Sequence, residues 1–324
     1  MSGGAAVAPP DGNELNPVLD VQLWQQTVVY AAPLILAACG ELLIERGGVL
    51  NIGIEGMMLV GAAVGFIVAV QTGSLTAGIT AAMAAGGMMA LVLAYYSVDL
   101  RGSQVTVGLG LFVLGIGLSS LLYRVAFGVR LTPPRLATLP VVAIPGLSDL
   151  PIVGRVVFTQ TVLVYAALLL VPAVHVFLFK TPLGLRLRAA GENPRAVDTL
   201  GIDVYALRRV ATVAGGLLIG AAGAYLPVAL TGTFNDNMTA GRGWLALMLV
   251  IFGRWRPAWA LLGALLFACV ESLQFKLALG TKLVPPQFLL MLPYLFAMVV
   301  LVWIYRGAKA PAALAVPYDR EARG

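Results

Sequence analysis

Residues 180–209 read KTPLGLRLRAAGENPRAVDTLGIDVYALRR, and this polar, basic segment lies between two long apolar runs, Val156–Phe179 and Val210–Leu230. A bilayer core about 30 Å thick is crossed by roughly 20 apolar residues in a helix. Both flanking runs meet that length. We therefore interpret residues 180–209 as a loop that connects two membrane spans.

The same apolar pattern recurs along the chain. Of its 324 residues, 60% are hydrophobic and only 11% are charged, a far more apolar balance than that of a soluble domain. One short run, Gly243–Phe252, has the length of half a span, because about ten helical residues extend about 15 Å. The expected fold class is an all-α polytopic membrane protein with about eight to nine transmembrane helices. The remaining long runs are Thr27–Leu43, Gly53–Val70, Leu75–Ser97, Val105–Tyr123, Ala258–Leu279 and Phe288–Tyr305.

The positions of Lys and Arg orient these spans. If residues 180–209 are cytoplasmic, most Lys and Arg residues lie on that side, as the positive-inside rule requires. Residues 1–26 then form an extracytoplasmic tail, which lacks the basic start and apolar core of a signal peptide. Residues 27–305 form the transmembrane domain, and residues 306–324 form a cytoplasmic C-terminal tail. The net charge of +6 is thus assigned to span ends and lipid headgroups, not to nucleic-acid binding.

Capping signals divide the polar segment into short helices. Thr181 precedes Pro182, and Asn193 precedes Pro194. A capping residue followed by proline is typical of a helix start, and Asp203 is expected to cap the next span. Helices this short are marginally stable alone, so contacts with the spans or with a partner must hold them.

The second short helix is expected to present one apolar face. Ala196, Val197 and Leu200 would form a small knob that fits a groove in a partner protein. The alternative is an ordinary loop whose arginines contact anionic headgroups. The spacing is compatible with both interpretations.

Residues 40–61, GELLIERGGVLNIGIEGMMLVG, form a second informative stretch. Interrupted, polar backbone at membrane depth is tolerated where it lines a cavity or is buried in protein. Asn51 and Glu55 are four residues apart, so they are expected on one helical face. Together with Gln104 they are candidates to line a translocation path. The alternative is that they form hydrogen bonds between helices.

Residues that could carry chemistry are few. The sequence contains no G-x-x-x-x-G-K-[S/T] loop, so this chain is not expected to bind ATP in the P-loop way. No catalytic triad and no metal motif are visible. Glu45 and Arg46 are expected to pair with each other, and His175 to pack in or face the bundle. Cys39 and Cys269 have no metal-like spacing.

Four segments together resemble a known family. The chain is similar to the permease subunits of bacterial ABC importers, in the branch shared by ribose-type sugar and branched-chain amino-acid permeases. It is most similar to nucleoside permeases that work with a basic-membrane-protein-type binding lipoprotein. A simple-sugar permease and an autonomous secondary transporter are the alternatives. The segments are Glu45–Gly61 (ERGGVLNIGIEGMMLVG), Leu183–Ile202 (LGLRLRAAGENPRAVDTLGI), Gly241–Pro257 (GRGWLALMLVIFGRWRP) and Pro311–Tyr318 (PAALAVPY).

The resemblance implies the other parts of an importer in the bacterial cytoplasmic (inner) membrane. A second homologous permease subunit would share the pore, and an extracytoplasmic lipoprotein would deliver the substrate. A tandem-domain ATPase would bind ATP and Mg, so no cofactor is expected in this chain. The residues implied to couple this chain to the ATPase are Gly191, Glu192, Asn193, Pro194, Arg195, Ala196, Val197 and Leu200.

Overall fold

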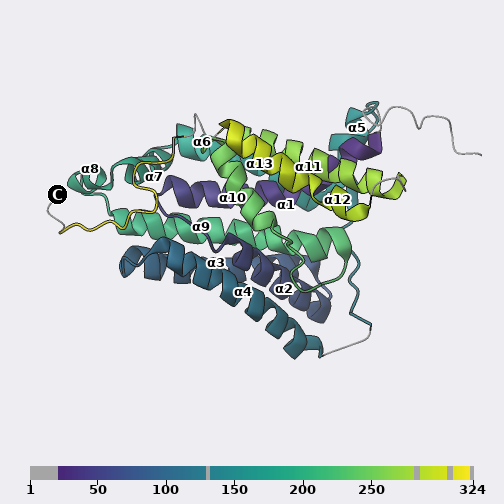
Figure 1. Cartoon of the computed structure of the whole chain (residues 1–324), viewed down its shortest axis with the longest axis horizontal. Helices are drawn as coiled ribbons and strands as arrows, with labels where there is room; N and C mark the ends of the chain where they lie inside the picture. Colours follow the sequence, from purple (N-terminus) through teal and green to yellow (C-terminus); the bar gives the residue numbers. More distant parts are fainter. Residues whose placement is uncertain (1–20, 129–131, 281–284, 305–308, 322–324) are drawn as a thin grey trace, which may run out of the picture.

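The computed structural model describes residues 21–128, 132–280, 285–304 and 309–321. Helices run roughly along the long axis of the molecule (Figure 1). Seven of the described helices are long and apolar enough to cross a membrane. They are α1 (Val21–Arg46), α2 (Ile54–Thr72), α3 (Leu75–Ala94) with the π-helical turn η2 (Tyr95–Asp99), α4 (Gln104–Phe127), α6 (Val162–Lys180), α9 (Val204–Tyr225) with the π-helical turn η3 (Leu226–Thr231), and α11 (Pro257–Gly280).

Shorter elements complete the fold. The predicted half-span is helical, and the last predicted span is divided in two at Met291. Helix α6 begins later than its apolar run, because residues 159–161 pair with a strand, Val141 lying opposite Thr161. The expected tail–span boundary falls inside α1, and residues 1–20 lie outside the described residues. The short elements are β1 (Val141–Ala143), α5 (Val153–Val157), β2 (Thr159–Thr161), α7 (Pro182–Glu192), α8 (Pro194–Thr199), α10 (Arg242–Phe252), α12 (Pro286–Leu290) and α13 (Leu292–Ile304).

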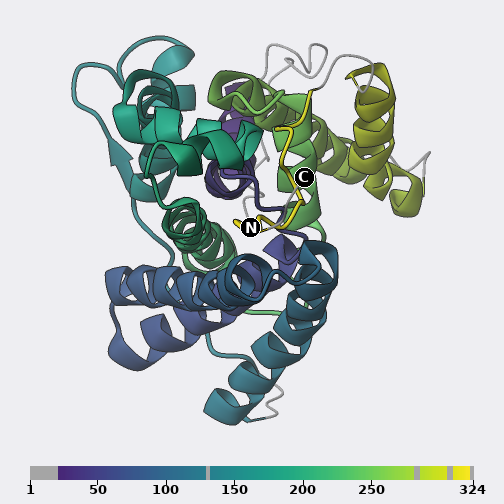
Figure 2. The ribbon, with the colours of Figure 1, turned by 90° about the vertical axis from the view of Figure 1, so that its left-hand side faces the viewer.

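Helix α9 occupies the centre of the bundle and packs on α1, α2 and α3 (Figures 1 and 2). Glycines permit this packing. A Cβ atom at Gly61 of α2 would lie 2.5 Å from the carbonyl oxygen of Gly220, and one at Gly40 of α1 would lie 2.5 Å from that of Gly215. In lipid no hydrophobic force drives helices together, so their association depends on close packing, which small residues allow. The spacing Gly216-x-x-x-Gly220 indicates this packing in the sequence.

The two ends of the bundle differ. Helices α7 and α8 lie at one end together with residues 309–321, and α5 lies at the other end (Figure 1). Two segments without long helices, residues 47–53 and 232–241, lead into α2 and α10. The starts of these two helices meet, as described below.

The outer face of α6 corrects one expectation. His175 is exposed there and stacks on Phe179, with ring centroids 5.1 Å apart. The buried face of α6 is formed by Val171, Val174 and Leu178. The expectation that His175 packs in or faces the bundle is therefore wrong.

Candidate functional site

One side chain joins the starts of α2 and α10. Glu55, in the first turn of α2, is only 2% exposed. Its carboxylate accepts hydrogen bonds from Thr239 Oγ1 (2.5 Å), Gly241 N (2.8 Å) and Gly243 N (2.6 Å). The two amides belong to the N–H groups that a helix start leaves unpaired, and the helix dipole favours a carboxylate there. These four residues are called the α2–α10 junction below.

The junction depends on two glycines. A Cβ atom at Gly243 would lie 2.7 Å from the Cα of Glu55, so a larger residue would push α10 away from α2. Gly241 has a φ of +83°, a left-handed conformation that favours glycine. The side chain between them, Arg242, pairs with Glu271 of α11 at 2.5 Å. The sequence G-R-G therefore places two backbone amides on Glu55 and one guanidinium on another helix.

Asn51 lies in the segment before α2 and not on its helical face. Its Nδ2 donates to Glu41 Oε2 of α1 at 2.9 Å, and both side chains are buried. Because α2 begins at Ile54, the expectation that Asn51 and Glu55 share one helical face is wrong. In the described part of the chain, Asn51 Oδ1 and Glu41 Oε1 have no hydrogen-bond partner.

Gln104 ties the same segment to α4. Its Oε1 accepts a hydrogen bond from Leu50 N at 2.7 Å, and the side chain is buried in the first turn of α4. Asn51, Glu55 and Gln104 thus all make contacts between segments of this chain. Their part in a translocation path stays a prediction.

A second polar contact closes α1 at the α7–α8 end. Trp255 Nε1 donates to Glu45 Oε2 at 2.5 Å, and Arg46 donates to the carbonyl oxygen of Trp255 at 2.7 and 3.0 Å. Arg46 also lies 4.0 Å from Glu192 at the end of α7. The expected Glu45–Arg46 pair is wrong, because both side chains bind Trp255.

The capping predictions for the polar segment are confirmed. The side-chain oxygens of Thr181, Asn193 and Asp203 each accept a hydrogen bond at 3.1 Å from the backbone N–H three residues further on. They begin α7, α8 and α9 respectively. Proline follows the first two caps, where its missing N–H costs no helical hydrogen bond.

The predicted apolar face of α8 is divided. Val197 is buried in a small core with Val204 and Tyr318, whereas Ala196 is exposed and Leu200 is 77% exposed. Helix α8 ends at Thr199, so Leu200 lies beyond its last turn. The expectation of one face for Ala196, Val197 and Leu200 is therefore wrong, because Val197 anchors α8 and the other two point outward.

The remaining predicted coupling residues lie around this turn. Gly191 is buried against the end of α1, where a Cβ atom would clash with the carbonyl oxygen of Arg46. Pro194 is half-buried, and the others are exposed. The exposed members are Glu192, Asn193 and Arg195.

Residues 309–321 cover α7 and α8, a role that the sequence did not reveal. Arg208 of α9 is buried and donates to the carbonyl oxygens of Gly47 (3.0 Å), Ala313 (3.5 Å) and Val316 (3.1 Å). A single guanidinium thus joins the end of α1, the start of α9 and the C-terminal segment. The signal in the sequence was the basic pair Arg208-Arg209 beside the apolar run that begins at Val210.

An ion pair holds the end of this segment. Asp198 of α8 accepts hydrogen bonds from Arg320 Nε (2.8 Å) and from the Tyr318 hydroxyl (3.0 Å). The Arg320 guanidinium holds the pKa of Asp198 below its usual range. Arg101 and Asp319 form a further ion pair at 2.8 Å.

This pair predicts a pH dependence. The pKa of Asp198 is lower in the folded chain than in the unfolded chain. The ionised carboxylate therefore stabilises the folded C-terminal segment fully above the ordinary aspartate pKa of about 4, and this stabilisation is lost as the pH falls below that value. Asp198→Asn is expected to loosen residues 318–320 already at neutral pH, because Asp198 binds Tyr318 and Arg320. Amide hydrogen exchange measures this, and exchange in α1 should stay unchanged. Equal exchange in variant and wild type would contradict the prediction.

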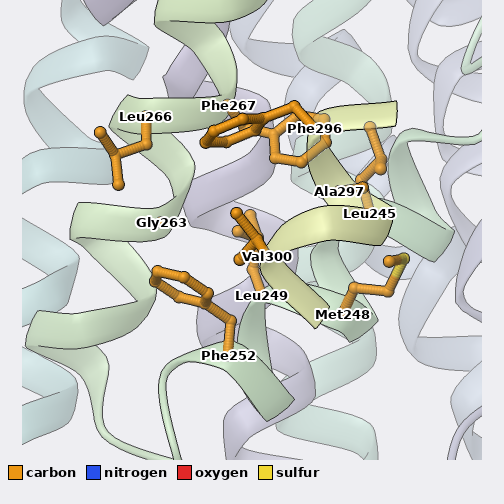
Figure 3. A pocket seen from close by; sticks show the side chains of 10 residues that line it. All are labelled: Leu245, Met248, Leu249, Phe252, Gly263, Leu266, Phe267, Phe296, Ala297 and Val300. Carbon is orange, nitrogen blue, oxygen red and sulfur yellow. The ribbon is translucent and has the colours of Figure 1, made fainter. Parts of the chain in front are cut away.

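The cavity between α10, α11 and α13 offers nothing to a polar solute. It measures about 20 Å³, which is space for about one water molecule. Its lining is apolar throughout (Figure 3). Such a cavity stays dry, so it is a small gap in helix packing. The lining residues are Leu245, Met248, Leu249, Phe252, Gly263, Leu266, Phe267, Phe296, Ala297 and Val300.

Comparison with known proteins defines the class. Residues 24–304 match the family described as branched-chain amino acid transport system / permease component. The chain is 38% identical to the candidate glucose ABC transporter permease TsgC13 of Haloferax volcanii, over 92% of this chain and 98% of the relative. It is 34% identical to the guanosine ABC transporter permease NupQ of Bacillus subtilis (92% and 96%). It is 35% identical to the nucleoside ABC transporter permease NupC of Lactococcus lactis subsp. cremoris (90% and 94%).

A solved structure supports the fold alone. A candidate metal-chelate-type ABC transporter in an inward-facing conformation superposes with a TM-score of 0.51 at 19% identity, over 94% of this chain and 93% of the other. The chain belongs to the permease-component family named above. It is a multi-pass membrane protein and the permease subunit of an ABC importer, a transport subunit and not itself an enzyme.

Proposed function

We propose that this permease conducts nucleosides across a bacterial cytoplasmic membrane. The observation that carries the proposal is the similarity, over at least 90% of this chain, to two relatives named as guanosine and nucleoside permeases. Glucose is the second candidate, because the relative named for glucose is 38% identical. Both cargoes are neutral and polar, so a path for either needs hydrogen-bonding groups and not a fixed counter-charge.

The α7–α8 end is proposed to face the cytoplasm and to dock on a tandem-domain ATPase. This orientation puts Arg46, Arg101 and the arginines of α7 and α8 inside, in agreement with the positive-inside rule. A second homologous permease would complete the pore. A substrate-binding lipoprotein would dock at the α5 end.

The contacts around α7 explain how docking would move the spans. The buried Gly191 and the Arg46–Glu192 pair bring α7 against the end of α1, and Trp255 joins α1 to the turn before α11. A displacement of α7 and α8 is therefore transmitted to these helices. ATP would shift the population between the two cavity orientations through its different affinity for each ATPase state.

Uptake measurements test the cargo. Labelled uridine and adenosine are compared with labelled ribose and glucose, in the native host with and without this gene. Loss of nucleoside uptake alone is the expected result. Loss of sugar uptake alone would contradict the nucleoside proposal and leave the ABC architecture in place.

A further inference from the structure

Two aromatic side chains from distant parts of the sequence lie together beside the α2–α10 junction. Phe112 of α4 and Trp244 of α10 have ring centroids 5.4 Å apart and an interplanar angle of 77°, an edge-to-face pair. Both side chains are half-buried, so part of each ring is accessible. Trp244 directly follows Gly243, which places it in the first turn of α10.

The first turn of α2 packs against the backbones of the two helices that carry the rings. On one side, a Cβ atom at Gly243 would lie 2.7 Å from the Cα of Glu55. On the other side, a Cβ atom at Gly56 would lie 2.9 Å from the Cα of Phe112. Two adjacent residues of α2 therefore touch the backbones of the two helices that carry the rings. The backbones that carry the two rings are therefore already in place before a ligand binds, and such preorganisation favours binding.

Among the described residues, the contact of Trp244 is the ring pair with Phe112, and its indole N–H makes no hydrogen bond, whereas that of Trp255 binds Glu45. Unpaired N–H groups are costly against lipid, because hydrocarbon accepts no hydrogen bond. The N–H of Trp244 is thus suited to contact with water or with a polar solute.

We propose that Phe112 and Trp244 form an aromatic contact for the base of the transported nucleoside in the translocation path. The base stacks on the accessible ring faces, as bases do on aromatic side chains in general. The Trp244 N–H donates a hydrogen bond to a base acceptor or a sugar hydroxyl. This inference rests on the proposed nucleoside cargo, because a simple sugar has no base to stack.

Cysteine labelling tests whether this face is accessible to water. The chain has two cysteines, so a variant with Cys39→Ala and Cys269→Ala supplies a clean background. Trp244→Cys and Phe112→Cys are each introduced there, and Leu169→Cys, at a side chain 70% exposed on α6, is the control. The assembled transporter in membrane vesicles is treated with a charged methanethiosulfonate, with and without uridine.

The expected result is labelling at positions 112 and 244 that uridine slows, and no labelling at position 169. Absence of labelling at both positions, with and without ATP, would overturn the proposal. If glucose slows the labelling and uridine does not, the path is filled with water, but base recognition and the nucleoside cargo are both overturned. Labelling slowed by neither solute would overturn the binding role alone, provided that nucleoside uptake depends on this gene.

Uptake by ring variants gives an independent measurement. Trp244→Ala and Phe112→Ala are expected to lower the rate of ATP-dependent uridine uptake about tenfold, with unchanged copurification of the ATPase. Trp244→Phe, which keeps a ring and removes the N–H, should lower the uptake rate less than Trp244→Ala does. The matched control is Trp259→Ala, at a tryptophan of α11 that is 52% exposed. Wild-type uptake by both alanine variants would overturn the proposal.

Discussion

Leu200→Asp is expected to weaken the binding of this permease to its ATPase about 10- to 100-fold and to abolish most transport. Leu200 is 77% exposed beside α8. Burying a leucine side chain contributes about 1.5–3 kcal/mol, and about 1.4 kcal/mol corresponds to a factor of ten in affinity. An aspartate there would also have to lose its hydration on docking. Copurification of the ATPase with the tagged permease measures the effect.

The exposed position makes this variant informative. Leu200 has few contacts within its own chain, so thermal stability should equal that of the wild type. The matched control is Leu150→Asp, the same change at an exposed leucine in the loop at the opposite end. Undiminished ATPase binding by Leu200→Asp, at the same salt and detergent, would contradict the assignment of α7 and α8 as the coupling surface.

Glu55→Ala is expected to destabilise the bundle by about 3–5 kcal/mol and to abolish transport. The change removes the acceptor of three hydrogen bonds and leaves the Thr239 hydroxyl and the amides of Gly241 and Gly243 without partners. Leaving a buried donor without a partner costs about 1–3 kcal/mol, and this variant leaves three such donors. Thermal unfolding of the purified permease in detergent and uridine uptake in cells are the measurements.

Two glycine variants, one at the junction and one away from it, give a second test and its control. Gly243→Ala should reproduce the loss, because its Cβ atom would lie 2.7 Å from the Cα of Glu55. Gly110→Ala on α4 should be neutral, because a Cβ atom there meets nothing within 4 Å. Wild-type stability of Glu55→Ala would show that the junction does not hold α2 and α10 together.

The local features of this fold could be predicted from the sequence. Apolar length located the seven long spans but not the division of the last predicted one at Met291. The caps at Thr181, Asn193 and Asp203 located three helix starts. Each of these signals acts within a few residues, so a single sequence carries it. The direction of Val197 was missed because it depends on Tyr318, which lies in the C-terminal segment.

The buried polar residues could be predicted from the sequence, but their hydrogen-bond partners could not. Glu55 was a candidate because it interrupts apolar sequence, yet its acceptor role involves Thr239, 184 positions away. Glu45 and Arg46 are adjacent, which suggested a pair, but Trp255 offers both a donor and an acceptor to them. Burial in the membrane demands that such groups find partners, and only the packing of distant helices determines which ones.

Reconstitution distinguishes an ATP-driven importer from a secondary transporter. The ATPase, the binding lipoprotein, the second permease and this chain are placed in liposomes, and accumulation of labelled uridine is followed with and without ATP. The expected result is accumulation that requires ATP and this chain, and that is lost with Leu200→Asp. Accumulation driven by an ion gradient without ATP would contradict the account and identify an autonomous secondary transporter.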